Sequence, residues 1–173
     1  MYICGDKVTL RSVKLSDANI ITKWKKDHFI KHMALDHDSK ITLKNQRNDI
    51  KQAIESHNQI YLMITPNNET DPIGYIRLNW IDNRKTIAWL RFALGKARGK
   101  GFGKDALFAL LKHLFLSGLH RIEGETYEYN ERSINLLKHL GFKIEGVKRK
   151  AHFDGKNYRD ILVFGLLKED FIQ

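Results

Sequence analysis

The stretch from Leu90 to Leu116 is the feature that most constrains how this chain can fold. It begins with residues of strand character and continues into a turn with three alternating glycines, Gly99, Gly101 and Gly103. After the turn, leucines recur at the period of an amphipathic helix, at Leu107, Leu110, Leu111 and Leu114. The stretch therefore predicts a strand, a glycine-rich loop and a helix that is covered on most of its sides.

The glycine-rich loop lies where a phosphate group can bind. The first backbone N–H groups of a helix have no partner within it, and the helix dipole adds partial positive charge there. Arg98, Lys100 and Lys104 contribute further positive charge. The pattern indicates a phosphate seat, with an ordinary strand-to-helix turn as the alternative. The spacing G-x-G-x-G differs from the G-x-G-x-x-G of the dinucleotide fingerprint. The Walker A loop does not fit either, because Asp105 stands where that loop needs Ser or Thr.

Three segments carry a resemblance to a known family. The hexapeptide Arg98–Gly103 (RGKGFG) matches the pattern Arg/Gln-x-x-Gly-x-Gly/Ala of the GNAT superfamily of acyl-CoA-dependent N-acyltransferases. The segment Arg121–Phe142 resembles the fifth strand, the Asn-x-x-Ser helix start and the Leu-Gly-Phe helix exit of that family. The segment His152–Phe171 resembles the final hairpin of the branch that contains ribosomal-protein N-terminal acetyltransferases and spermidine acetyltransferases.

The resemblance spans nearly the whole chain and implies an α/β fold. Its expected form is a GNAT-like mixed, mostly antiparallel central sheet flanked by helices and splayed between the fourth and fifth strands. The length of 173 residues suits one domain with a full core, so we expect residues 1–173 to be a single acetyltransferase domain.

Alternating and periodic patterns predict the other elements. Before the central stretch we expect a strand, two helices and three further strands, at Lys7–Lys14, Ser16 or Asp17 to about Lys26, Thr42–His57, Ile60–Thr65, Ile73–Trp80 and Thr86–Leu94. The helix capped by Thr42 should turn Ile50, Ala53 and Ile54 inward. After the central stretch we expect a strand at Arg121–Tyr127, a helix at Asn130–Gly141, and a hairpin. The hairpin pairs Phe142–Ala151 with Asn157–Leu167 around an Asp154-Gly155 turn.

Composition limits the setting of the protein. Hydrophobic residues at 42% and charged residues at 29% are values of a globular protein. The single Cys4 can form neither an internal disulfide nor a cysteine-based zinc site, and the histidines lack metal-ligand spacing. No segment reaches the about 18 apolar residues of a membrane span, and none resembles a signal peptide. We therefore expect a cytoplasmic protein with no metal and no membrane partner.

The resemblance implies acetyl-CoA as cosubstrate. The glycine-rich loop would take its pyrophosphate, the backbone of the fourth strand would pair with its pantetheine arm, and Asn130 would bond to that arm. Simple N-capping explains Asn130 about equally well. The implied cofactor-binding residues are Phe92, Leu94, Arg98, Gly99, Lys100, Gly101, Phe102, Gly103, Lys104 and Asn130.

The chain departs from the family at the residues that usually act as acid and base. Leu137 stands where many members have a Tyr general acid, and Ala88 and Trp89 stand about where a Glu is common. Ser133 occupies a position that the N-terminal acetyltransferase branch also fills with Ser, so its hydroxyl is the candidate for contacting the thiolate or thioester. Capping the first helical turn is its alternative role.

The general base must come from elsewhere. Glu125 is our candidate, and Glu123, which alternates with it on one face of the same strand, is the next; His120 and His152 are further alternatives. Each of these side chains is equally explained as a solvated surface residue.

The acceptor is left open. The first two helices line the acceptor side in this family, so candidates for substrate contact are Trp24, His28, Phe29, His32 and Met33. Packing beneath the helices is the alternative role of the aromatic residues. A small-molecule or peptide amine fits the reaction, whether a protein N-terminus, a polyamine, an amino sugar or antibiotic, or an amino acid. Either a monomer or a homodimer is compatible with the sequence.

Two functions of different class follow. The first is an acetyl-CoA-dependent N-acetyltransferase that moves an acetyl group to a primary amine by direct attack in a ternary complex. The alternative is a basic RNA- or ribosome-associated binding protein, suggested by the net charge of +10 and by Tyr127, Tyr129 and Tyr158. No nucleic-acid-binding motif supports the alternative, and the first function does not require nucleic acid.

Overall fold

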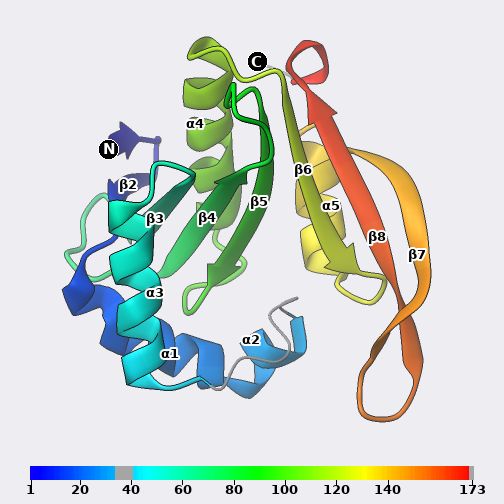
Figure 1. The fold of residues 1–173 in the computed structure, drawn as a ribbon, viewed down its shortest axis with the longest axis horizontal. Coiled ribbons are helices and arrows are strands. Elements are labelled where there is room, and N and C mark those ends of the chain that lie inside the picture. Colours follow the sequence, from blue (N-terminus) through cyan, green and yellow to red (C-terminus); the bar gives the residue numbers. More distant parts are fainter. Residues whose placement is uncertain (34–40, 172–173) are drawn as a thin grey trace.

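The computed structural model describes residues 1–33 and 41–171 (Figure 1). In these residues, strands form an eight-stranded sheet in the order β1-β2-β3-β4-β5-β6-β8-β7. The strands are β1 (Tyr2–Cys4), β2 (Val8–Ser12), β3 (Gln59–Pro66), β4 (Gly74–Trp80), β5 (Ile87–Leu94), β6 (Arg121–Tyr127), β7 (Lys143–Phe153) and β8 (Tyr158–Leu167). The helices are α1 (Ala18–Lys26), α2 (His28–Met33), α3 (Leu43–Glu55), α4 (Phe102–Leu116) and α5 (Glu131–His139), with short 3-10 turns at Leu15–Asp17 and Lys168–Asp170.

The sheet is antiparallel except where β5 runs parallel to β6. This arrangement confirms the predicted mixed, mostly antiparallel sheet flanked by helices. The short strand β1 was not predicted. It pairs with β2 from Tyr2 opposite Arg11 to Cys4 opposite Thr9, and three residues are too few to show the alternation that identifies a strand.

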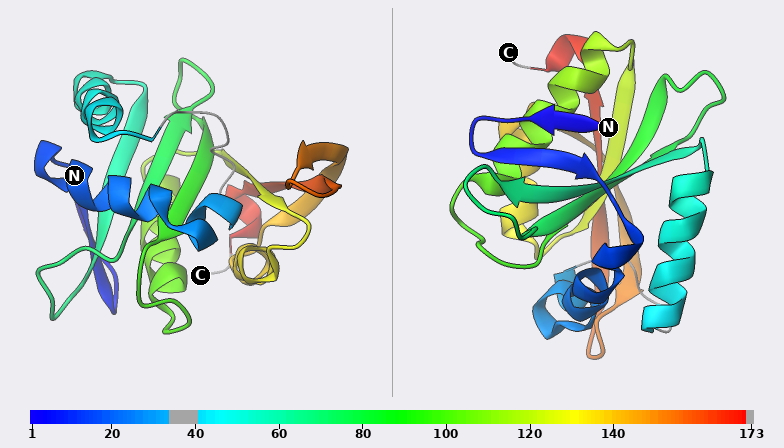
Figure 2. Two further views of the ribbon diagram at one scale, coloured as in Figure 1. Left: turned by 90° about the horizontal axis from the view of Figure 1, so that it is seen from below. Right: turned by 90° about the vertical axis from the view of Figure 1, so that its left-hand side faces the viewer.

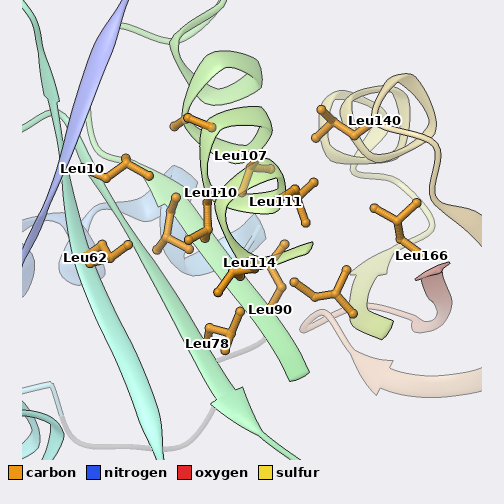
Figure 3. Close-up of a cluster of buried hydrophobic side chains, with 14 of the residues drawn as sticks. Leu10, Leu62, Leu78, Leu90, Leu107, Leu110, Leu111, Leu114, Leu140 and Leu166 are labelled. Atoms are coloured by element: carbon orange, nitrogen blue, oxygen red, sulfur yellow. The ribbon is translucent and has the colours of Figure 1, made fainter. Parts of the chain in front are cut away.

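Helices cover the two faces of the sheet (Figure 2). On one face, α4 and α5 pack on the larger apolar core, to which Leu10, Leu62, Leu78 and Leu90 belong. Figure 3 shows these strand leucines lying against the leucines of α4. On the other face, α1, α2 and α3 pack on a second core, whose strand residues include Tyr61, Met63 and Tyr75. Alternate residues of β3 and β4 thus serve different cores, as the two-residue period of a strand requires.

Helix α4 is buried on most of its sides, as its leucines predict. Leu107, Leu110 and Leu111 are fully buried and Leu114 is 3% exposed. The prediction for α3 was wrong in one residue. Ile50 and Ala53 are buried, but Ile54 is 55% exposed. Ile54 lies one position beyond Ala53, and the 100° step between neighbouring residues of a helix turns it toward solvent.

The expected helix ends at Thr42, Asn130 and Gly141 are confirmed, whereas Asp17 precedes α1 without a side-chain capping hydrogen bond. The Thr42 hydroxyl accepts a hydrogen bond from the Asn45 N–H and begins α3. The Asn130 side chain accepts one from the Ser133 N–H and begins α5. Gly141 follows α5 with φ of 92°, a left-handed conformation that glycine adopts without a Cβ clash.

Strands β5 and β6 separate along their length (Figure 1). They pair only from Ile87 opposite Arg121 to Trp89 opposite Glu123. Beyond this point β5 continues beside β4 as far as Leu94, whereas β6 continues beside β8 as far as Tyr127. The splay between these two strands is therefore confirmed.

The hairpin of β7 and β8 turns at Asp154 and Gly155, as predicted. The Asp154 carboxylate accepts hydrogen bonds from the Lys156 and Asn157 N–H groups at 2.8 Å each. These bonds and the Arg159 guanidinium hold the pKa of Asp154 well below its ordinary value.

Among residues 1–33 and 41–171, the helices are all too short or too polar to cross a membrane.

Candidate active site

Two cavities meet at the place where β5 and β6 separate. The larger has a volume of about 460 Å³ and extends from β5 along the glycine-rich loop to α5. The smaller has a volume of about 80 Å³ and lies among β3, β4, β5 and β6. Residues that line both cavities are Met33, Phe92, Asn130 and Ser133. At the splay, the larger cavity beside the N-terminus of α4 therefore meets the smaller cavity among the strands.

The glycine-rich loop exposes backbone to the larger cavity. Gly99 and Gly101 both have φ of 82°, in the left-handed region that favours glycine. Gly101 precedes the first residue of α4, and Gly103 lies in its first turn. Lys104 lines the same cavity. Free N–H groups, a helix N-terminus and a cationic side chain therefore surround one space, which suits a phosphate group.

Most of the predicted cofactor-binding residues line the larger cavity, and two do not. Those that line it are Phe92, Leu94, Arg98, Gly99, Gly101, Gly103, Lys104 and Asn130. Phe102 packs on the larger core instead, and Lys100 is exposed at the surface of the loop. The wall also contains Phe29, Arg132 and Asn135, which sequence reasoning did not assign to the cofactor.

Arg98 holds the loop as well as lining the cavity. Its Nε donates to the Leu94 carbonyl oxygen at 2.9 Å, and its Nη2 donates to the Gly95 carbonyl oxygen at 3.4 Å. The guanidinium also lies 4.3 Å from the centroid of the Phe29 ring and 4.0 Å from the Asp27 carboxylate. Arg98 therefore ties the end of β5 to α2, a role that the motif alone does not show.

A turn from the far N-terminus supports the same loop. The Asp105 carboxylate in the first turn of α4 accepts hydrogen bonds from the N–H groups of Asp6, Lys7 and Val8, at 3.0, 2.8 and 3.0 Å. A Cβ atom built on Gly101 would lie 3.2 Å from the Lys7 ammonium nitrogen. Lys7 is thus a further cation beside the glycine-rich loop. Sequence reasoning missed it because Lys7 and Asp105 lie far apart in the chain.

Ser133 lies at the junction of the two cavities. Its backbone N–H donates to Asn130 Oδ1 at 3.2 Å, so Asn130 caps α5 and the Ser133 side chain is not the cap. Asn130 also donates through Nδ2 to the Met33 carbonyl oxygen at 3.5 Å, which links α5 to α2. Ser133 lines both cavities, so its hydroxyl can reach a group that extends from one cavity into the other.

Glu125 is the one acidic residue in the described wall of the smaller cavity. Its side chain is 10% exposed and forms an ion pair with Lys148. Leu137 lines the same cavity and is 3% exposed, so an apolar side chain occupies the usual position of the Tyr acid.

The other candidate bases lie elsewhere. The Glu123 carboxylate accepts from Arg121 Nε at 2.9 Å and does not reach the cavity wall. The His152 ring stacks on Tyr127 at 4.4 Å. His120 lies before the start of β6, at the opposite end of that strand from Tyr127. Glu125 is therefore the only one of the four proposed bases that the described wall contains.

The residues suggested for acceptor contact divide into three groups. Trp24 is 5% exposed and stacks on Tyr75, and its ring occupies the space that a Cβ at Gly95 would need. It belongs to the core. Phe29 and Met33 line the cavities. His32 stacks on Tyr129 with ring centroids 4.9 Å apart, and His28 stacks on His32 at the surface.

The smaller cavity also contains tyrosine side chains, which the sequence did not point to. Tyr61 is 4% exposed, and burial raises the pKa of its hydroxyl. Tyr61 therefore stays protonated and cannot serve as a base. The residues outside positions 34–40 and 172–173 contain no cluster of His, Cys, Asp and Glu that could hold a metal ion.

Comparison with known proteins identifies the family. The model of the acetyltransferase (GNAT) domain matches residues 7–143. The chain is 27% identical over 172 residues to the SPbeta prophage-derived uncharacterized N-acetyltransferase YokL of Bacillus subtilis (strain 168), covering 98% of this chain and 95% of that one.

Two solved structures have the same fold. Ribosomal-protein-S5-alanine acetyltransferase from Vibrio fischeri gives a TM-score of 0.83 at 22% identity over 100% of both chains. Spermidine N-acetyltransferase from Vibrio cholerae in complex with CoA and spermine gives a TM-score of 0.83 at 19% identity, over 96% of this chain and 99% of that one. The family match spans most of the chain and includes the glycine-rich loop and α5. The protein therefore belongs to the GNAT family of N-acetyltransferases, enzymes that use acetyl-CoA.

Proposed function

We propose that this chain transfers the acetyl group of acetyl-CoA to a primary amine by direct attack in a ternary complex. The single observation that carries the proposal is the meeting of the two cavities at Ser133. One cavity has the positive charge and free N–H groups that suit a phosphorylated cosubstrate, and the other contains a carboxylate that suits an amine. Direct attack requires both substrates to be present at one junction.

The larger cavity fits acetyl-CoA in its chemistry. A side chain at Gly99 or Gly101 would be strained, since both residues have φ of 82°, and a Cβ at Gly101 would also approach the Lys7 ammonium. Lys104 and Arg132 add positive charge to the wall, while Phe92 and Leu94 line its apolar part beside the free edge of β5. We assign the pyrophosphate to the loop and the pantetheine arm to the edge of β5 beyond Trp89.

The chemistry then falls to Ser133 and Glu125. An ammonium must lose a proton before it can attack, and the Glu125 carboxylate in the smaller cavity can accept that proton, directly or through water. The neutral nitrogen attacks the thioester carbonyl carbon and a C–N bond forms. The C–S bond then breaks as the thiolate leaves, and the nitrogen loses its second proton to the thiolate or to water, which gives the amide and the free thiol. The Ser133 hydroxyl can donate a hydrogen bond to the developing negative charge on oxygen or sulfur.

The scheme needs no strong acid at the position that Leu137 occupies. A thiol has an ordinary pKa of about 8.5, so a thiolate is a competent leaving group at neutral pH.

The acceptor is a separate question. The two related structures are those of a ribosomal-protein-S5-alanine acetyltransferase and a spermidine N-acetyltransferase. For this chain we propose a small-molecule or peptide amine, and one acetyltransferase domain formed by the whole sequence.

The test is a binding measurement followed by an acceptor panel. Titration calorimetry with acetyl-CoA should show binding, and release of free thiol should depend on the added amine. Failure to bind acetyl-CoA, together with RNA binding that weakens steeply with salt, would instead support the basic binding protein. Tyr127, one of the aromatic residues considered for that alternative, is fully buried and cannot stack on a nucleic-acid base.

A further inference from the structure

The described wall of the larger cavity contains three cationic side chains and no acidic one. The cations are Arg98, Lys104 and Arg132. A ligand in this cavity therefore meets side chains of one sign of charge, which favours an anion. Acetyl-CoA carries two separate anionic groups, its pyrophosphate and its 3′-phosphate, and the ribose lies between them.

The three cations differ in what they already bind. Arg98 is used within the protein, because it donates to the carbonyl oxygens of Leu94 and Gly95. Lys104 is in the first turn of α4, beside the glycine-rich loop, where it suits the pyrophosphate. Arg132 lies apart from both, in the first turn of α5. In the part of the chain that the structure describes, its guanidinium has no hydrogen-bond or ion-pair partner.

The packing of α5 shows where Arg132 lies relative to the loop. Helix α5 meets the loop at Leu136, whose Cδ2 lies 3.6 Å from a Cβ built on Gly103. Arg132 is four residues before Leu136, on the same face of the helix and about 6 Å nearer its N-terminus. Asn135 lies between them on that face, and all three residues of α5 line the larger cavity. Arg132 is therefore a second cationic position, displaced along α5 from the phosphate seat.

The chemistry of these two polar side chains suits a phosphorylated nucleoside. A planar guanidinium binds a phosphate through two parallel N–H groups. The Asn135 carboxamide presents a donor and an acceptor side by side, which match the N6 and N7 edge of adenine. Both residues are exposed, and the Asn135 side chain, like that of Arg132, has no partner within residues 1–33 and 41–171. Either can be substituted without removing a contact that holds the fold.

We propose that Arg132 and Asn135 form the subsite for the adenosine 3′-phosphate end of acetyl-CoA, with Arg132 on the 3′-phosphate and Asn135 on adenine. The inference rests on the proposed transferase function and deepens it, because the loop and the edge of β5 take only the pyrophosphate and the pantetheine arm. Arg132 thereby becomes a specificity-determining residue. It favours CoA over 3′-dephospho-CoA, which lacks only the 3′-phosphate.

This pair of ligands gives a direct test. Titration calorimetry measures the Kd of CoA and of 3′-dephospho-CoA, and their ratio reports the contribution of the 3′-phosphate. For the wild-type protein we expect 3′-dephospho-CoA to bind at least about tenfold more weakly, the effect of one charge-assisted contact. In Arg132→Gln the ratio should fall to about twofold, which is the share left to the other cations. Arg132→Lys should give an intermediate ratio, because it keeps the charge and loses the planar fork.

Two further variants complete the test. Lys138→Gln removes the same charge from the same helix, at an exposed residue that lines neither of the two cavities, and it should keep the wild-type ratio. Asn135→Ala should raise the Kd of both ligands by the same factor, about threefold or more, because both contain adenine. The Tm of each variant shows that it is folded.

The outcomes separate this inference from the proposed function. Equal affinity of the wild-type protein for the two ligands, or a wild-type ratio in Arg132→Gln, would overturn the role of Arg132. A ratio that falls equally in Lys138→Gln would do the same, since it would show general attraction by charge. Unchanged affinities in Asn135→Ala would remove Asn135 from the subsite. All these results leave the transferase function standing, whereas failure of the wild-type protein to bind CoA and acetyl-CoA would overturn that function and this inference with it.

Discussion

The Asp105 carboxylate accepts the Lys7 backbone N–H at 2.8 Å and thereby holds the β1–β2 turn against the first turn of α4. Two neighbouring N–H groups of the same turn bind the same carboxylate. The Lys7 side chain is consequently kept beside Gly101. Asp105, an acidic residue in the first turn of α4, thus holds a cation beside the glycine-rich loop, while its own carboxylate binds backbone N–H groups.

Replacing Asp105 by Ala should weaken both the fold and cofactor binding. Up to three backbone donors would lose their acceptor, at a total cost of about 2 kcal/mol, which lowers the Tm by about 4–8 °C in a chain of this size. The Kd of acetyl-CoA should rise several-fold because Lys7 is no longer held. Asp6→Ala, which removes an exposed acid from the same turn, is the control. A wild-type Kd in a destabilised Asp105→Ala protein would show that Lys7 does not contact the cofactor.

Gly101→Glu should abolish acetyl-CoA binding. The substitution forces a side chain into a backbone conformation with φ of 82° and places negative charge in the phosphate seat. Gly118→Glu is a matched control, because Gly118 also has positive φ and open space around it but lies at the other end of α4. Calorimetry should show a loss of affinity of about a hundredfold or more for Gly101→Glu alone. Similar affinity in the two folded variants would make the loop merely structural.

Ser133→Ala should lower kcat by about tenfold to a hundredfold with little change in the Kd of acetyl-CoA, as expected for one hydrogen bond made mainly in the transition state. The effect cannot come from loss of a helix cap, because Asn130 supplies the cap. Asn130→Ala provides the comparison, since it should cost about 1 kcal/mol of stability. An unchanged kcat in Ser133→Ala would remove the hydroxyl from the mechanism.

The sequence predicts those parts of the site that depend on neighbours in the chain. The glycine-rich loop, the Asn130 cap and the hairpin at Asp154 each follow from local backbone chemistry, and each is where the pattern placed it. The support of the loop by Asp105 joins residues 98 positions apart in the chain, and no local pattern encodes such a contact. The position of Arg91 in the wall of the smaller cavity likewise depends on strand register, which brings it opposite Arg77.

Asp17 should make stability depend on pH in the acid range. Burial raises the pKa of this carboxyl, but hydrogen bonds from Arg11 at 2.8 Å and from the Lys14 N–H outweigh that effect and lower it below its ordinary value. The stabilisation is therefore present above the ordinary pKa of about 4 and is lost as the pH falls toward the lower pKa of the folded protein. Asp17→Asn should lower the Tm at neutral pH, and the difference from wild type should narrow below about pH 4. The exposed Asp71, changed to Asn, should show neither effect; a constant difference for Asp17→Asn at all pH values would contradict the prediction.

Glu125→Gln should impair the reaction by removing the group that receives the amine proton. The substitution keeps the shape of a side chain that is 10% exposed but also leaves Lys148 without its carboxylate partner, so Lys148→Met is measured beside it. If Glu125 is the base, kcat/KM for Glu125→Gln should be low at neutral pH and should approach the wild-type value as the pH rises toward the amine's own pKa, because the amine then deprotonates without help. Lys148→Met should retain the wild-type pH profile, since the carboxylate remains. A Glu125→Gln protein with the wild-type rate and profile would exclude Glu125 as the base, and an amine that binds already neutral would become the better account of the mechanism.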